Sequence, residues 1–139
     1  MIEDTDSSRG QFLRADHLFH VTLKYTRTGD VIKNTIRRLV LAMEFAMGES
    51  LERKKAKDIH ELGPMRTEMM KKLMPKNKDV KHFIDFYNYL KKIDKGQFTI
   101  KEEYRKNVAL VVDKEEISIS KLKELLARTK YFMELSQEF

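Results

Sequence analysis

The segment between residues 31 and 57 constrains the fold most, because its apolar side chains recur every three or four residues without a break. They are Ile32, Ile36, Leu39, Val40, Met43, Met47 and Leu51. This spacing places side chains on one face of an α-helix. The opposite, solvent side holds Arg37, Arg38, Glu44 and residues 52–57. The segment therefore predicts a long amphipathic helix that frays near Asp58 and buries its stripe against other elements.

The same periodicity predicts further helices, in a chain with only five glycines and two prolines. They are expected over residues 9–27, 66–74, 80–95 and 120–137, with a short one over residues 99–107 that starts at a capping box. Gly29 is expected to end the first helix, and Asp30 to cap the next one. The alternative is one kinked helix that continues through Gly29. Short connections favour an all-α fold, an antiparallel bundle of four to five helices.

Residues 108–119 leave two interpretations open. The β-branched residues of "NVALVV" and "EISIS", on either side of "DKE", indicate a short β-hairpin before the last helix. Ala109 and Leu110 suit a helix equally well. Either Ser118 or Ser120 caps the helix that follows.

The length of 139 residues fits one domain with its own core. Residues 1–8 are acidic and polar and are expected to be a disordered tail, in which Ser7 or Ser8 caps the first helix of a single domain over residues 9–139. The absence of cysteine excludes disulfides and thiolate sites and favours a reducing cytoplasm. No apolar signal-peptide core and no stretch as long as a membrane span occur, so neither secretion nor a membrane is expected.

Positive charge is concentrated in one segment. The net charge is +6, and residues 52–82 alone hold ten Lys or Arg against five Asp or Glu, an excess of five. One interpretation is a solvated face of helix ends and loops. The other is a surface that binds RNA or nucleotide phosphates. The residues predicted to bind phosphate are Arg53, Lys54, Lys55, Lys57, Lys71 and Lys72.

No pattern predicts a metal, a cofactor or a familiar active site. His17 and His20 lie three residues apart with Asp16 beside them, but zinc needs further ligands that the sequence does not nominate. The glycines stand alone, so there is no glycine-rich phosphate loop. Arg53 and His60 have the spacing of metal-independent RNA cleavage, yet two helical turns, about 10 Å of rise, would separate them. We therefore predict that this pair is not catalytic.

The order of these patterns resembles the HEPN superfamily, the small helical domains named for nucleotide binding in higher eukaryotes and prokaryotes. "RADHLFHVTLKYTRTGD" followed by "VIKNTIRRLVLAMEFAMGESL" resembles the opening pair of helices with its glycine-containing junction. "KDIHELGPM" resembles a loop that often holds a histidine. "FIDFYNYLKKIDKGQFT" resembles the third helix, and "ISKLKELLARTKYFMELSQEF" the closing one. The likeness covers about residues 13–137 and consists of a pattern of helices.

The resemblance implies one of two kinds of function. Members are either metal-independent ribonucleases, often in toxin–antitoxin systems, or non-catalytic proteins that bind nucleotides, RNA or partner proteins. They commonly form homodimers, and many pair with a nucleotidyltransferase-like protein. The ribonucleases carry an Arg-x4–6-His motif late in the domain, where this chain has Lys91 and Lys92 and no histidine after them. We therefore expect a non-catalytic, dimeric prokaryotic or archaeal member; a ribonuclease toxin and a purely structural partner subunit are the alternatives.

Overall fold

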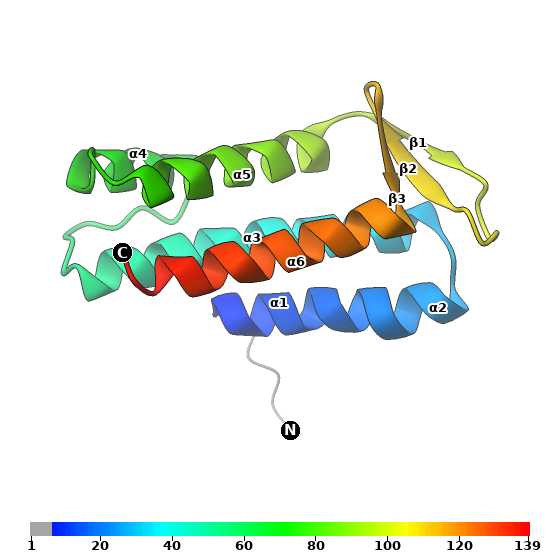
Figure 1. The fold of residues 1–139 in the computed structure, drawn as a ribbon, viewed down its shortest axis with the longest axis horizontal. Coiled ribbons are helices and arrows are strands. Elements are labelled where there is room, and N and C mark those ends of the chain that lie inside the picture. The colour runs from blue at the N-terminus through cyan, green and yellow to red at the C-terminus, as the bar shows by residue number, and fades with distance from the viewer. Residues whose placement is uncertain (1–6) are drawn as a thin grey trace.

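The computed structural model describes residues 7–139, in which helices run back and forth along one long axis (Figure 1). The first helical arm joins α1 (Ser8–His17), the π-helical turn η1 (Leu18–Thr22) and α2 (Leu23–Tyr25) without a break. The other helices are α3 (Gly29–Arg53), α4 (Gly63–Leu73), α5 (Lys78–Lys95) and α6 (Ile119–Ser136). The prediction of a mostly helical fold is confirmed, and a small sheet is added to it.

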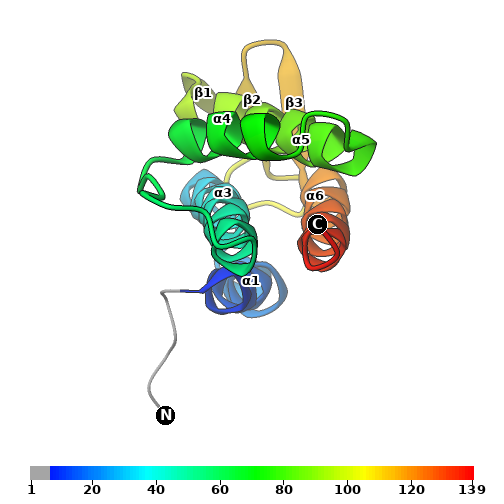
Figure 2. The same cartoon turned by 90° about the vertical axis from the view of Figure 1, so that its left-hand side faces the viewer.

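Helix α3 is the centre of the bundle, because α1, α4, α5 and α6 all pack against it. Seen from the end, α3 and α6 lie side by side, with α4 and α5 above them and α1 below (Figure 2). Ile36, Met43 and Phe83, which the periodicity predicts to be in the core, are fully buried. Their burial confirms the predicted register of α3 and α5.

The helix starts depend on polar side chains that accept backbone hydrogen bonds. Ser7 caps α1 as expected, since its Oγ accepts from the amide of Gly10 at 3.0 Å. Residues 1–6 of the predicted tail lie outside the described residues. Thr28, and not Asp30, caps α3. Gly29 is the first residue of α3 rather than a stop, and the side chain of Ile100 occupies the place where a Cβ at Gly29 would lie.

The sheet closes the end of the bundle near the start of α3 (Figure 1). Its antiparallel strands are β1 (Phe98–Lys101), β2 (Ala109–Val112) and β3 (Glu115–Ser118), in that order. The hairpin interpretation of residues 108–119 therefore holds for β2 and β3, and Asp113 in their two-residue turn has a φ of 55°, as tight hairpin turns require.

The short helix expected over residues 99–107 is wrong. Thr99 and Ile100 pair with β2 opposite Val111 and Leu110. β-branched side chains fit such a paired strand, and this non-local pairing outweighs the local capping signal. Glu102 then adopts a φ of 52°, which a helix does not allow.

No helix among residues 7–139 combines the length and the apolar content needed to cross a bilayer.

Candidate nucleic-acid interface

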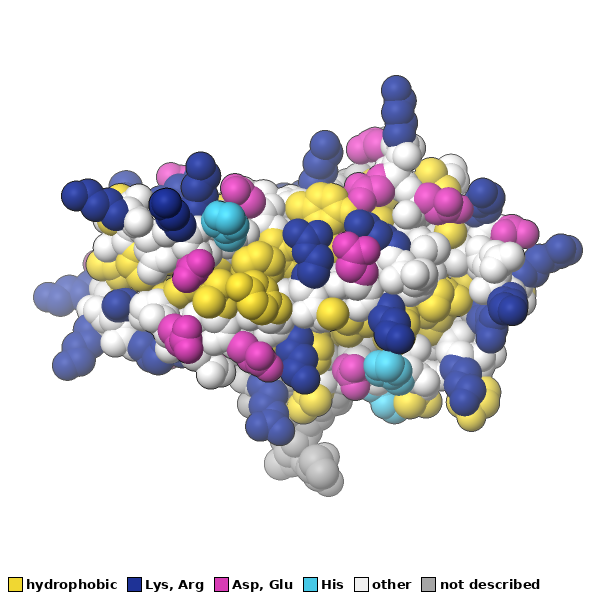
Figure 3. All heavy atoms as spheres, viewed as in Figure 1, with side chains coloured by type: hydrophobic (Ala, Val, Ile, Leu, Met, Phe, Trp, Pro, Cys, Tyr) yellow, Lys and Arg dark blue, Asp and Glu magenta, His cyan; other side chains and the backbone are white. Residues whose placement is uncertain are grey.

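The predicted phosphate-binding residues gather at one end of the bundle, the left-hand end in Figure 1, where α3 ends, α4 ends and α5 begins. Lysine and arginine side chains project from this end (Figure 3). We call it the basic end and define it by its exposed cations: Arg53, Lys54, Lys55, Lys57, Lys71, Lys72, Lys76, Lys78 and Lys81. The fold thus joins three charged stretches of sequence into one surface.

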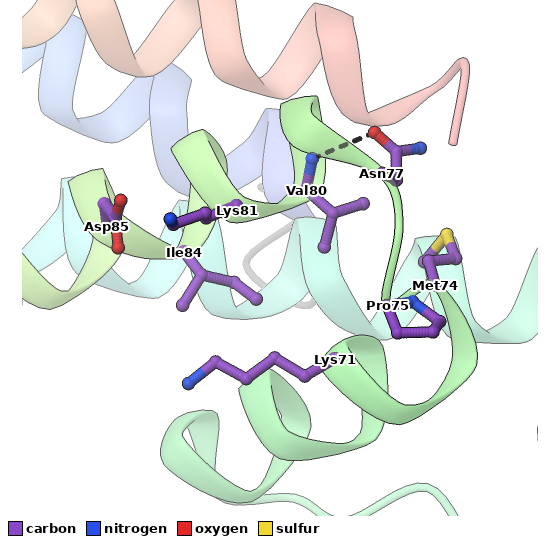
Figure 4. A pocket seen from close by; sticks show the side chains of 8 residues that line it. All are labelled: Lys71, Met74, Pro75, Asn77, Val80, Lys81, Ile84 and Asp85. Atoms are coloured by element: carbon purple, nitrogen blue, oxygen red, sulfur yellow. Dashed lines mark hydrogen bonds between the residues drawn. The ribbon is translucent and has the colours of Figure 1, made fainter.

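Helix α4 lies between two grooves at the basic end. Its consecutive residues Lys71 and Lys72 point about 100° apart, so they line different grooves. Lys71 lines the first groove, a cleft of about 390 Å³ between α4 and α5 (Figure 4). Lys81 stands on the α5 side of this cleft, and Met74, Val80 and Ile84 give it an apolar lining. The cleft therefore offers cations beside an apolar surface.

The second groove, of about 310 Å³, lies between α4 and the end of α3. Its cations are Lys57 and Lys72, and its apolar side chains include Leu51, Met69 and Leu73. Lys57 follows the turn that ends α3, in which Lys55 has a φ of 59°. α3 therefore stops at Arg53, earlier than the predicted fraying point, and the chain turns its lysines back beside α4.

The cations of the basic end differ in how strongly the fold already engages them. Within residues 7–139, the side chains of Lys54, Lys55, Lys57 and Lys72 form no hydrogen bond or ion pair. Lys71 reaches Glu68 at 3.5 Å, but both side chains are exposed, and such pairs contribute little. Four of the six predicted lysines and arginines are therefore available to an external anion.

Arg53 has a structural contact instead. Its guanidinium donates to the carbonyl oxygen of Ser136 at 2.8 Å, at the last turn of α6, where helix carbonyls lack partners within the helix. His60 lies exposed in the loop before α4, and its carbonyl oxygen accepts from Arg66 Nε at 2.6 Å. Arg53 is thus held by α6, whereas cleavage would require its guanidinium and the His60 imidazole to converge on one phosphate.

A buried polar network holds α4 against α3 and α5 and so fixes both grooves. The hydroxyl of Tyr87 donates to the Glu44 carboxylate at 2.5 Å, and Lys91 Nζ lies 3.3 Å from the same oxygen. Arg66 of α4 donates to the carbonyl oxygen of Glu44 at 2.8 Å. Burial, and then the hydrogen bond to Glu44, raise the pKa of Tyr87, so this hydroxyl stays protonated as a donor. Gly63, at the start of α4, lies so close to Tyr87 and Glu44 that a Cβ there would overlap both.

The remaining candidate ligands behave as surface side chains. His20 Nε2 lies 3.3 Å from Asp16 Oδ1 one turn earlier on the helical arm, and both side chains are about half exposed. Within residues 7–139, no group of three or more His, Asp or Glu residues comes together in a way that could hold a metal ion.

Three features of these sites were missed at the level of sequence. Lys81 lines the first groove together with Asn77 and Asp85, and their four-residue spacing is a signal that would have found it. A second arginine and histidine with the spacing of the cleavage motif, Arg14 and His20, lie on the first helical arm. Glu44 was placed on the solvent side of its helix, but it is nearly buried because α4 and α5 cover it.

The chain matches no protein-family model, no curated protein and no solved structure at a significant level. The resemblance to the HEPN superfamily therefore stays a prediction.

Proposed function

We propose that the chain is a non-catalytic binding domain that holds single-stranded RNA by its phosphates at the basic end. The observation that carries this proposal is a group of four exposed lysines, Lys54, Lys55, Lys57 and Lys72, which lie where α3 ends beside α4 and whose side chains have no partner among residues 7–139. Mobile ammonium groups contact phosphates without a fixed geometry, which gives affinity with little sequence preference.

The two grooves beside α4 support a single strand as the ligand. Each carries lysines next to an apolar lining, formed by Val80 and Ile84 in one groove and by Leu51 and Leu73 in the other. A single strand exposes both its phosphates and its unstacked bases, so its phosphates can contact the lysines while its bases contact the apolar lining. A double helix presents mainly its backbone.

A solvated face remains the simplest alternative for a run of charge. At the sheet end of the molecule, two lysines are paired with acids: Lys101 with Glu116 at 3.3 Å and Lys33 with Asp94 at 2.7 Å. At the basic end, Lys54, Lys55, Lys57 and Lys72 have no such partners among the described residues. This difference favours an external polyanion.

The proposal agrees with the non-catalytic function that the HEPN resemblance implies. By the same resemblance, we propose that the chain forms a homodimer in the cytoplasm. Catalysis by Arg53 and His60 is not part of it, because Arg53 is bound to the end of α6.

The test is a titration of labelled single-stranded RNA in EDTA, followed both by fluorescence anisotropy and by a denaturing gel. We expect saturable binding, similar affinities for RNAs of different sequence, and intact RNA at the end of the titration. His60→Ala should behave like the wild type in both readouts. RNA cleavage in EDTA that disappears with His60→Ala would establish the ribonuclease alternative, and an absence of binding would leave the structural-subunit alternative.

A further inference from the structure

The small sheet has one open edge, at the other end of the bundle from the basic end (Figure 1). β1 pairs with β2 on one side only, and Figure 2 shows it at the border of the sheet with no other element beyond it. Within residues 7–139, no further backbone hydrogen bond reaches residues 98–101. About half of the N–H and C=O groups of an edge strand point away from its neighbour, so β1 can pair with one more strand.

The two edges of the sheet differ in how they are protected. β3 carries Glu115 and Glu116, and the hydroxyl of Tyr89 donates to Glu115. Charged side chains of this kind discourage another strand from pairing with an edge. β1 consists instead of three strong β-formers and one lysine. The edge that is open to pairing is therefore β1.

Two apolar side chains of β1 extend the core to this edge. Phe98 and Ile100 lie opposite Val112 and Leu110, which are buried, so all four share the face of the sheet that packs on the bundle. Ile100 also contacts Gly29 at the start of α3. Phe98 and Ile100 nevertheless remain 38% and 37% exposed. An added strand with apolar side chains two residues apart would continue this buried face.

The loop after β1 is fixed against the start of α3. Glu103 Oε2 accepts from the amide of Gly29 at 3.1 Å, and the amide of Tyr104 donates to the carbonyl oxygen of Arg27 at 2.6 Å. Tyr104 has a φ of 67°, which is uncommon for an aromatic residue, and its ring is exposed. The surface beside β1 is thus held in one shape before any partner arrives.

The segment around β1 is positively charged. Residues 95–107 hold four Lys or Arg against two Glu, an excess of two, and residues 26–30, which the loop contacts, are neutral overall. The side chains of Lys95, Arg105 and Lys106 form no hydrogen bond or ion pair among the described residues. A second copy of β1 would bring the same positive segment alongside, whereas an acidic strand complements it.

We propose that the β1 edge binds an extended acidic segment of another protein, which adds a fourth strand to the sheet. Backbone hydrogen bonds to β1 give affinity, and Phe98 and Ile100 select apolar side chains at alternate positions. The positive segment selects Asp or Glu on either side of them. The lysines proposed to bind RNA lie at the far end of α3, so the two sites are independent.

The test is fluorescence anisotropy of the full chain with the labelled peptide DEVTVDE, in which the two valines lie on one face of a strand. Peptide DEVVTDE has the same composition but turns its valines to opposite faces, and KKVTVKK reverses the charge. We expect saturable binding of DEVTVDE that is about tenfold tighter than that of either control. The amides of residues 98–101 should exchange hydrogen more slowly when DEVTVDE is bound.

Variants of the protein separate the apolar contribution from the charge. Phe98→Thr keeps a residue that suits a strand but loses apolar surface, and it should weaken binding about fivefold. Arg105→Glu combined with Lys106→Glu should weaken binding more at low salt than at high salt. The matched charge reversal is Lys92→Glu combined with Lys114→Glu, between α5 and the β2–β3 turn, and it should bind like the wild type.

The proposal is overturned if DEVVTDE binds as tightly as DEVTVDE, or if protection from exchange appears at the basic end instead of β1. It is also overturned if Lys57→Gln combined with Lys72→Gln abolishes peptide binding, because attraction of the peptide's charge to the basic end would then explain it. If sedimentation shows that Phe98→Thr converts a dimer to a monomer, a second copy covers β1 and the proposal fails. RNA binding by Phe98→Thr should equal that of the wild type, so the two sites fail separately.

Discussion

Removal of one buried hydroxyl, in Tyr87→Phe, should measurably loosen the attachment of α4 and α5 to α3. The Tyr87 side chain is fully buried, and its hydroxyl lies 2.5 Å from the Glu44 carboxylate. A hydrogen bond to a charged group contributes about 1.5–3 kcal/mol. Lys91 remains 3.3 Å from the same carboxylate and limits the loss. We therefore expect a decrease of about 2 kcal/mol in the free energy of unfolding.

The expected shift in melting temperature follows from the size of the chain. An unfolding entropy of about 2.1 cal/mol/K per residue gives roughly 0.3 kcal/mol/K for this protein, so the loss corresponds to about 7 °C. Thermal and urea denaturation near neutral pH, well below the raised pKa of the Tyr87 hydroxyl, measure it.

The same chemical change at Tyr131 is the control. Tyr131 is 59% exposed, and its ring packs on Phe132 with 5.2 Å between centroids, a contact that Tyr131→Phe keeps. Its stability should match the wild type within about 0.5 kcal/mol. Combining Tyr87→Phe with Glu44→Gln should cost less than the sum of the two changes. Equal, small effects of Tyr87→Phe and Tyr131→Phe would refute the reasoning about the network.

The remaining predictions concern the core, a close approach and assembly. Phe83→Ala should lower the free energy of unfolding by about 3–5 kcal/mol in urea denaturation, through lost burial and the cavity left behind; an unchanged midpoint would mean that α5 is wrongly registered. Gly63→Ala should lower the melting temperature, because its Cβ would overlap the Tyr87 hydroxyl, and a neutral result would contradict the tight approach of α4. Sedimentation at micromolar concentration should show a dimer that Tyr25→Glu converts to a monomer, since Val21 and Tyr25 are apolar and exposed on the first helical arm; a monomeric wild type would rule this out.

Periodicity alone predicted the long helices and the core, because a helix that buries one face repeats its apolar residues locally. It succeeded best in α3 and α5, where Ile36 and Phe83 are buried as expected. It failed at β1 (Phe98–Lys101), although apolar and polar side chains alternate there, because the capping box at Thr99 and Glu102 predicts the start of a helix. The strand is stabilised by pairing with β2, a non-local contact that a local helix signal does not reveal.

The functional surfaces were predictable only in part, for a related reason. The charge excess of residues 52–82 pointed to the basic end, but the structure was needed to show that Arg53 is bound to α6 and that α4 divides the lysines between two grooves. The contact between Glu44 and Tyr87 joins helices far apart in the sequence, so it leaves no spacing signal within one segment.

The salt dependence of RNA binding tests the central claim most directly. Each phosphate neutralised on a single strand contributes about 0.7 to the slope of log affinity against log salt concentration. The decisive variant replaces four lysines with glutamine at Lys54, Lys55, Lys57 and Lys72. Its matched control makes the same replacement away from the basic end at Lys92, Lys95, Lys106 and Lys114. We expect the first variant to flatten the slope by about 2–3 units and the control to keep the wild-type slope. Equal slopes in all three proteins would contradict the claim that the basic end binds RNA.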